Sequence, residues 1–68
     1  EAAVLFKAID QLPEKQRVAF LLHKTEAMPY AEIAEVLETS VHAVESLMGR
    51  AKQNLKNYLH NYYLKNKL

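Results

Sequence analysis

Residues 30–51 read Tyr30-Ala31-Glu32-Ile33-Ala34-Glu35-Val36-Leu37-Glu38-Thr39-Ser40-Val41-His42-Ala43-Val44-Glu45-Ser46-Leu47-Met48-Gly49-Arg50-Ala51, and this stretch decides the fold. Its first part carries apolar residues at i, i+3, i+4 and i+7, which define one face of a helix: Tyr30, Ile33, Ala34 and Leu37. Three polar residues follow and end in Ser40, a residue type preferred at helix N-caps. A second periodic run then begins. Two helices joined by a three-residue turn predict a helix-turn-helix, which places its second helix in the major groove of DNA.

The flanking sequence predicts two helices upstream and a long extension of the last one. Pro13 is expected to end the first helix and to open the second, since proline is tolerated at the first helical position. The apolar run Val18 to Leu22 requires the second helix to have partners on more than one side. We therefore expect residues 1–68 to form one all-α, four-helix domain with a helix-turn-helix and no winged elements. The predicted helices span about 2–11, 14–24, 30–37 and 41–63.

Size and composition restrict the possibilities further. The chain has 68 residues, half of them apolar, and no cysteine, so its stability must come from helix packing without disulfides. One glycine and two prolines favour a few long helices over many short strands. The longest apolar run is too short to cross a bilayer, and we expect no signal peptide. The chain starts at Glu1 without Met, which is consistent with a piece of a longer protein.

The charge is unevenly distributed, although the net charge is only +1. Residues 1–40 hold four basic and seven acidic side chains, whereas residues 41–68 hold five basic and one acidic. A basic second half that contains the second motif helix suits an element that faces phosphates. The alternative is a solvated basic helix end that complements its own dipole.

The fourth helix has two distinct faces at 100° per residue. Its apolar side carries Val44, Met48, Ala51, Leu55, Tyr58, Leu59 and Tyr62, and its polar side is centred on His42, Ser46, Gly49 and Gln53. Glu45 and Lys52 lie at one edge of the polar side, Arg50 lies at the other, and Leu47 borders the core. Gly49 costs about 1 kcal/mol relative to alanine inside a helix. Its place on the polar side indicates close approach of a partner surface, or a tolerated surface glycine.

Several short motifs together resemble region 4 of bacterial sigma factors, in particular the extracytoplasmic-function (ECF) group. They are Leu12-Pro13-Glu14-Lys15-Gln16-Arg17, Phe20, Leu22, Tyr30-Ala31-Glu32-Ile33-Ala34, Val44-Glu45-Ser46-Leu47 and Arg50-Ala51-Lys52, within about residues 9–59. The resemblance implies a cytoplasmic transcription initiation factor that recognises the promoter −35 element through the second motif helix. It also implies docking on the β-subunit flap of RNA polymerase, control by an anti-sigma factor, and a separate domain that melts the −10 element.

Carried over by position, the base-reading residues of the family fall on Glu45, Ser46, Gly49 and Arg50, and His42 at the helix start is a further candidate. Candidate phosphate contacts are Arg17, Thr39, Ser40, Lys52 and Gln53. The chain departs from the family pattern at Glu45 and Leu47, where many members carry basic residues. Glu38 stands where a glycine is frequent. If the backbone there is left-handed, a residue with a side chain costs about 1–2 kcal/mol.

Each candidate has an alternative interpretation. Arg50 suits guanine O6 and N7, or a phosphate, or solvent. Glu45 could accept a hydrogen bond from cytosine N4, or could pair with Lys52. Glu32 and Glu35 would be repelled by DNA unless they point elsewhere, which leaves open a protein-docking module or a response-regulator-type helix-turn-helix. We expect no enzyme, cofactor or metal site, because the sequence has no nucleophile–base pair, glycine-rich phosphate loop, carboxylate dyad or zinc-ligand spacing.

Overall fold

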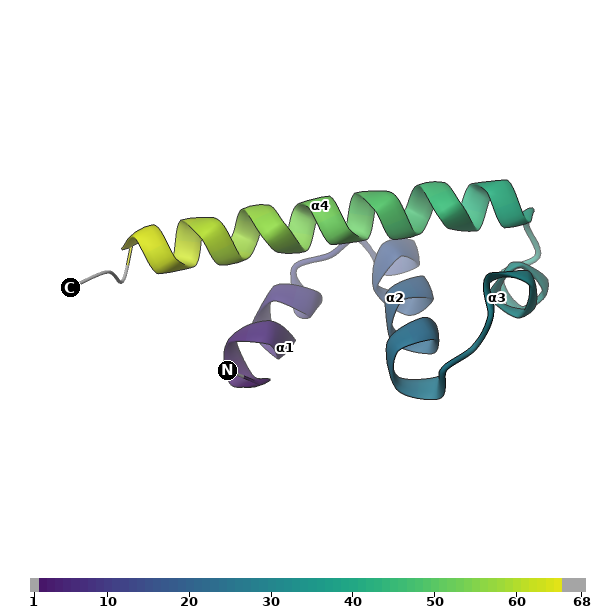
Figure 1. Ribbon diagram of the computed structural model, residues 1–68, viewed down its shortest axis with the longest axis horizontal. Coiled ribbons are helices and arrows are strands. Elements are labelled where there is room, and N and C mark those ends of the chain that lie inside the picture. The colour runs from purple at the N-terminus through teal and green to yellow at the C-terminus, as the bar shows by residue number, and fades with distance from the viewer. Residues whose placement is uncertain (1, 66–68) are drawn as a thin grey trace.

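The computed structural model describes residues 2–65, and within this range it consists of four helices with no strand (Figure 1). The helices are α1 (Ala2–Asp10), α2 (Glu14–Glu26), α3 (Tyr30–Val36) and α4 (Val41–Lys65). Figure 1 shows α4 extending along the long axis of the molecule, with α1, α2 and α3 arranged along one side of it. The predicted all-α architecture with four helices is confirmed. The predicted boundaries are wrong by one or two residues, and only at the C-terminal ends of the helices.

Both prolines lie one residue before a helix, as N-caps. This corrects the expectation that Pro13 occupies the first helical position. Pro13 has φ −55° and ψ 151°, and Pro29 has φ −66° and ψ 155°. In this extended conformation the Pro13 carbonyl accepts a hydrogen bond from the Arg17 amide at 2.9 Å, and the Pro29 carbonyl accepts one from Ile33 at 3.0 Å. Each proline therefore starts its helix by offering the first carbonyl acceptor.

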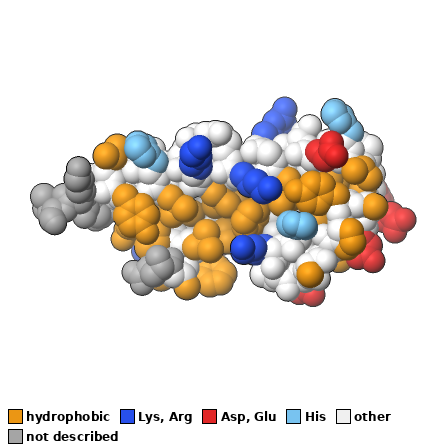
Figure 2. Space-filling view, viewed as in Figure 1, with side chains coloured by type: hydrophobic (Ala, Val, Ile, Leu, Met, Phe, Trp, Pro, Cys, Tyr) orange, Lys and Arg blue, Asp and Glu red, His pale blue; other side chains and the backbone are white. Residues whose placement is uncertain are grey.

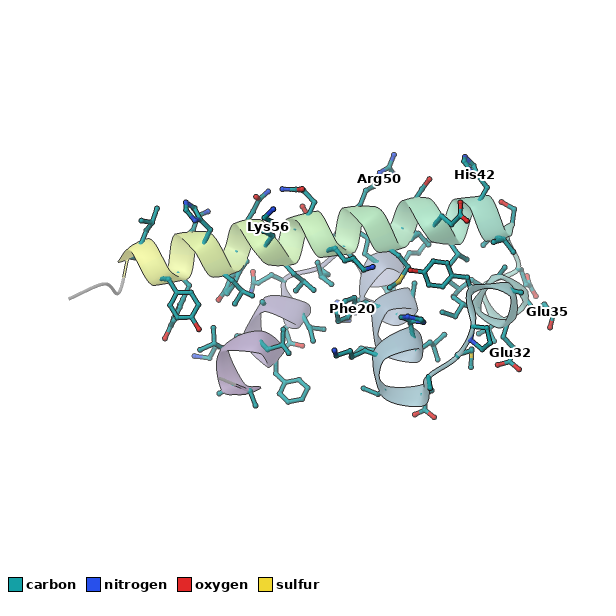
Figure 3. The ribbon with its side chains drawn as sticks, in the orientation of Figure 1. Phe20, Glu32, Glu35, His42, Arg50 and Lys56 are labelled. Atoms are coloured by element: carbon teal, nitrogen blue, oxygen red, sulfur yellow. The ribbon has the colours of Figure 1, made fainter. Side chains whose placement is uncertain are left out.

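The core consists of two clusters that lie next to each other along α4. The first contains Ala8, Ile9 and Leu12 at the α1 end together with Ala51 and Leu55, and the second contains Ala19, Ile33, Ala34, Val44 and Met48. Phe20 is partly buried and packs against both clusters. Figure 3 shows its side chain beneath α4, on α2. The apolar run of α2 therefore has partners on more than one side, as the sequence predicts.

The core predicted for the helix-turn-helix is confirmed in part. Ile33, Val44 and Met48 are at most 2% exposed and belong to the second cluster. Ala51 is also fully buried, but it packs in the first cluster with residues of α1. Leu37 is only half-buried at the edge of the second cluster, because α3 ends at Val36 and the chain turns there.

The turn between α3 and α4 is fixed by backbone and side-chain hydrogen bonds. The Thr39 amide donates to the Ala34 carbonyl at 2.8 Å, and the Glu38 amide donates to Glu35 at 3.2 Å. This pair of bonds is a Schellman motif, and it places Glu38 in the left-handed conformation with φ 55°. Ser40 then caps α4, since its hydroxyl accepts a hydrogen bond from the Ala43 amide at 3.0 Å. The predicted cap is confirmed, and the left-handed backbone on which the expected cost at Glu38 depends is present.

Replacement of Glu38 by glycine is expected to raise the free energy of unfolding by about 1 kcal/mol, because glycine adopts positive φ without steric cost. For a domain of this size the melting temperature should rise by about 4–8 °C in a thermal melt followed by circular dichroism. Glu35→Gly is the matched control. Glu35 is also an exposed glutamate, but it lies inside α3, so glycine there should lower the stability. Equal effects of the two substitutions would contradict strain at Glu38.

Candidate nucleic-acid interface

The polar side of α4 faces away from the other three helices. His42, Ser46, Gly49, Arg50 and Gln53 are all exposed, whereas the opposite side of the helix is buried in the two clusters. Figure 3 shows His42 and Arg50 on the edge of α4 that lies opposite α1, α2 and α3. We call this side the outward face of α4. Its residues lie outside both core clusters, so they are free to face a DNA groove.

Gly49 lies on this outward face, and the fold does not require it to be a glycine. A Cβ atom built at Gly49 would meet no atom of the protein within 4 Å. The backbone there is ordinary helix, because the described chain has no glycine with positive φ. The cost of glycine in a helix is therefore not offset by packing inside the protein. The interior of the protein therefore gives no reason for a glycine here, and both interpretations from the sequence stand: close approach of a partner surface, or a tolerated surface glycine.

Glu45 contacts His42 and not Lys52, which corrects the pairing considered from the sequence. Its carboxylate Oε1 lies 3.7 Å from the His42 Nδ1 atom, one turn earlier on α4. The two side chains are 59% and 90% exposed, so the contact contributes little to stability. Within residues 2–65 it is the single contact within 4 Å between a carboxylate oxygen and a side-chain nitrogen of Lys, Arg or His. Glu45 therefore remains available to a partner on the outward face.

A groove of about 360 Å³ lies beside the outward face and brings together residues from three parts of the chain. It is lined by Lys15 of α2, by Leu37 and Thr39 of the turn, and by Ala43, Ser46, Leu47 and Arg50 of α4. Leu47 is half-buried against the second cluster, so its assignment to the core edge is confirmed. Lys15 is not among the site residues that the sequence predicts. Only the packing of α2 on α4 brings Lys15 to the same groove as Arg50, and no local sequence pattern indicates how these two helices pack.

Two of the candidate phosphate contacts are engaged within the protein. Arg17 is partly buried, and its guanidinium donates to the Leu12 carbonyl at 3.1 Å, which ties the end of α1 to α2. Gln53 donates to the Asn57 side chain at 3.1 Å, one turn further along α4. Thr39, Ser40 and Lys52 are exposed, and of these Ser40 uses its hydroxyl in the α4 cap. The structure thus brings Thr39 to the groove and leaves Lys52 on the other flank of α4.

The charges on the visible surface are separated along the molecule. In Figure 2, Lys and Arg side chains lie over the middle of α4, and most acidic side chains gather at the α3 end. Figure 3 shows Glu32 and Glu35 on α3, pointing away from α4. These carboxylates therefore do not face the groove or the outward face of α4, which removes the electrostatic objection to a DNA partner there.

Two features are absent from the described part of the chain. Residues 2–65 contain no group of three His, Asp or Glu side chains placed to hold a metal ion. None of the four helices is both long enough and apolar enough to traverse a membrane.

Comparison with known proteins identifies the fold family. The family model described as "Sigma-70, region 4" matches residues 3–55. The ECF RNA polymerase sigma factor SigJ of Mycobacterium tuberculosis is 49% identical over 45 residues, which cover 66% of this chain and 14% of that protein. The ECF RNA polymerase sigma-E factors of Salmonella typhimurium and Escherichia coli are each 33% identical over 54 residues, covering 79% of this chain and 28% of those proteins. No solved structure gives a significant match.

These matches favour one of the helix-turn-helix classes considered from the sequence. The matched family is that of sigma factors, and the response-regulator alternative finds no support among the relatives. The chain spans less than a third of the length of the curated relatives that it matches.

Proposed function

Because the chain belongs to the sigma-70 region 4 family, whose model matches residues 3–55, we propose that it recognises the promoter −35 element through the outward face of α4. The observation that carries this proposal is the division of α4 into a fully buried side and an unpacked polar side that holds Ser46, Gly49 and Arg50. The proposed role is binding in transcription initiation in the cytoplasm, without catalysis. The 68 residues would act as one DNA-binding unit of a longer sigma factor.

The residues proposed to meet DNA have distinct chemical roles. The Arg50 guanidinium can donate two parallel hydrogen bonds to guanine O6 and N7 in the major groove. Ser46 can donate to or accept from a base edge, and Glu45 can accept from the amino group of cytosine. Gly49 leaves room for the floor of the groove to approach the helix backbone. His42, near the start of α4, and Thr39, in the turn, are placed to reach the neighbouring bases or phosphates.

RNA polymerase is the proposed protein partner, and the chain would dock on the flap of its β subunit. An anti-sigma factor is a second proposed partner, which would compete with polymerase. Glu32 and Glu35 are exposed and point away from α4, so they are free to face protein while α4 faces DNA. This arrangement also supports a second candidate function, a protein-docking module with little base reading. Sequence preference separates the two, because a docking module would hold polymerase without distinguishing one duplex from another.

The 68-residue chain is expected to bind duplex DNA weakly and with a steep dependence on salt, because its net charge is only +1. Each phosphate contact should contribute about −0.9 to the slope of log K against log salt concentration. Binding to a promoter should gain strength when polymerase and a second promoter-binding domain act together, since linked sites raise the effective concentration. Fluorescence anisotropy over a salt series, on −35-like and scrambled duplexes, measures both quantities. Tight, salt-insensitive binding by the chain alone would contradict the proposal.

A further inference from the structure

The groove beside α4 has an apolar floor and a charged rim. Leu37, Ala43 and Leu47 are half-buried and form the floor. Lys15 and Arg50 supply cations from two different helices, and Thr39 and Ser46 add hydroxyl groups. A ligand that fits such a surface has an apolar part and an anionic part next to each other. The sugar-phosphate backbone of DNA has this character, with a deoxyribose ring between successive phosphates.

The position of the groove also suits a DNA strand. A helix with its side chains is about 10–12 Å wide, and the major groove is about 12 Å wide, so the two strand backbones pass along the two flanks of an inserted helix. At 100° per residue, Leu47 and Arg50 lie toward one flank of α4, where the groove and Lys15 are. Lys52 and Lys56 lie toward the opposite flank, and both are exposed.

We propose that Lys15 binds a phosphate of one DNA strand in this groove, with the adjoining sugar against Leu37 and Leu47. The inference rests on the proposed function only in that α4 enters the major groove. Lys52 and Lys56 then bind phosphates of the other strand, so each strand is contacted by different cations. Lys15 acts as a positioning residue, because a phosphate contact fixes the register of the helix without reading a base.

The surroundings of Lys15 leave it free for this role. It is exposed, and within residues 2–65 it makes no hydrogen bond or ion pair through its ammonium group. It lies in the first turn of α2, where the helix dipole favours an anion. Glu14 precedes it in the same turn but does not line the groove. The Asn54 side chain donates to Gln16 at 2.8 Å, so a direct contact holds this turn of α2 against α4.

The test compares Lys15→Ala with Lys24→Ala in the 68-residue chain, by fluorescence anisotropy on a labelled duplex at low ionic strength. Lys24 is the matched control because it is also exposed and lies at the opposite end of α2. Lys15→Ala should weaken binding about ten-fold and lower the salt slope by about 0.9, whereas Lys24→Ala should change neither. Thermal melts of both variants check that the fold is intact, and Lys15→Arg should retain most of the affinity.

A second arm replaces single phosphates in each strand by uncharged methylphosphonates. At one phosphate position, the methylphosphonate should weaken DNA binding by the unsubstituted chain but should not weaken binding by Lys15→Ala any further. The phosphate position that shows this behaviour with Lys52→Ala should lie on the other strand. Equal binding by the Lys15 and Lys24 variants, or coupling of Lys15 and Lys52 to the same strand, would overturn the assignment. A Lys15 effect that is the same on −35-like and scrambled duplexes supports it. If no variant of the outward face alters sequence preference, the proposed function fails while the Lys15 contact stands.

Discussion

Replacement of Val44 by aspartate is expected to unfold the chain. Val44 is 0% exposed and lies in the second cluster with Ile33 and Met48, where the motif helices meet. A carboxylate there has no cation within the cluster, and burial of an unpaired charge costs several kcal/mol. A domain of this size has a total stability of about 3–10 kcal/mol, so the loss is comparable to the whole.

The measurement is the free energy of unfolding from urea titration followed by circular dichroism. Val41→Asp provides the control, because Val41 is also a valine on α4 but is 42% exposed. It should change the stability little, and an acid in the first turn of a helix is even favourable. A Val44 variant that melts like the unsubstituted chain would show that the two motif helices do not pack as described.

Replacement of Arg50 by alanine is expected to weaken binding to a −35-like duplex by about 1–3 kcal/mol, which corresponds to roughly 5- to 150-fold. The preference should relax at one base pair, because the guanidinium discriminates guanine through two hydrogen bonds. The fold should be unaffected, since Arg50 is exposed and lies outside both core clusters. Competition binding across duplexes with single base-pair changes, with polymerase reconstituted, measures the effect.

Lys56→Ala serves as the comparison for Arg50. Lys56 is an exposed cation on the same helix, and as a phosphate contact it should weaken all duplexes alike. Glu45→Lys should raise non-specific affinity and change the preferred base, because it exchanges an acceptor for a donor. If variants of Arg50, Ser46 and Glu45 all retain the original preference while polymerase docking persists, the chain is a protein-docking module.

Local patterns in the sequence predicted the helices and most of the core. The spacing of Tyr30, Ile33 and Ala34 gave α3, and Ser40 marked the start of α4 because its side chain caps the helix within three residues. These features depend on neighbours along the chain, so the sequence alone contains them. A left-handed backbone at Glu38 was considered only as a condition, through the resemblance to a family in which glycine is frequent at that position.

Features that depend on contacts between distant residues were not predicted. The groove beside α4 forms because Lys15 and Arg50 come together across the packed helices, 35 positions apart in the sequence. The hydrogen bond from Arg17 to Leu12 and the contact between His42 and Glu45 were likewise not predicted from the sequence. The partners of surface side chains depend on rotamers and on neighbouring helices, and neither of these produces a periodic pattern in the sequence.

The length of α4 gives the molecule the geometry of a lever. The helix is continuous over 25 residues, and it packs on α3 through Val44 and Met48 near its start and on α1 through Ala51 and Leu55 in its middle. At 1.5 Å per residue, Arg50 lies about 22 Å from the last described residues of α4. A tilt of about 9° about that end would move Arg50 by roughly the 3.4 Å rise of one base pair. In the proposed role, whatever holds the C-terminal end of α4 also selects which base pair Arg50 meets.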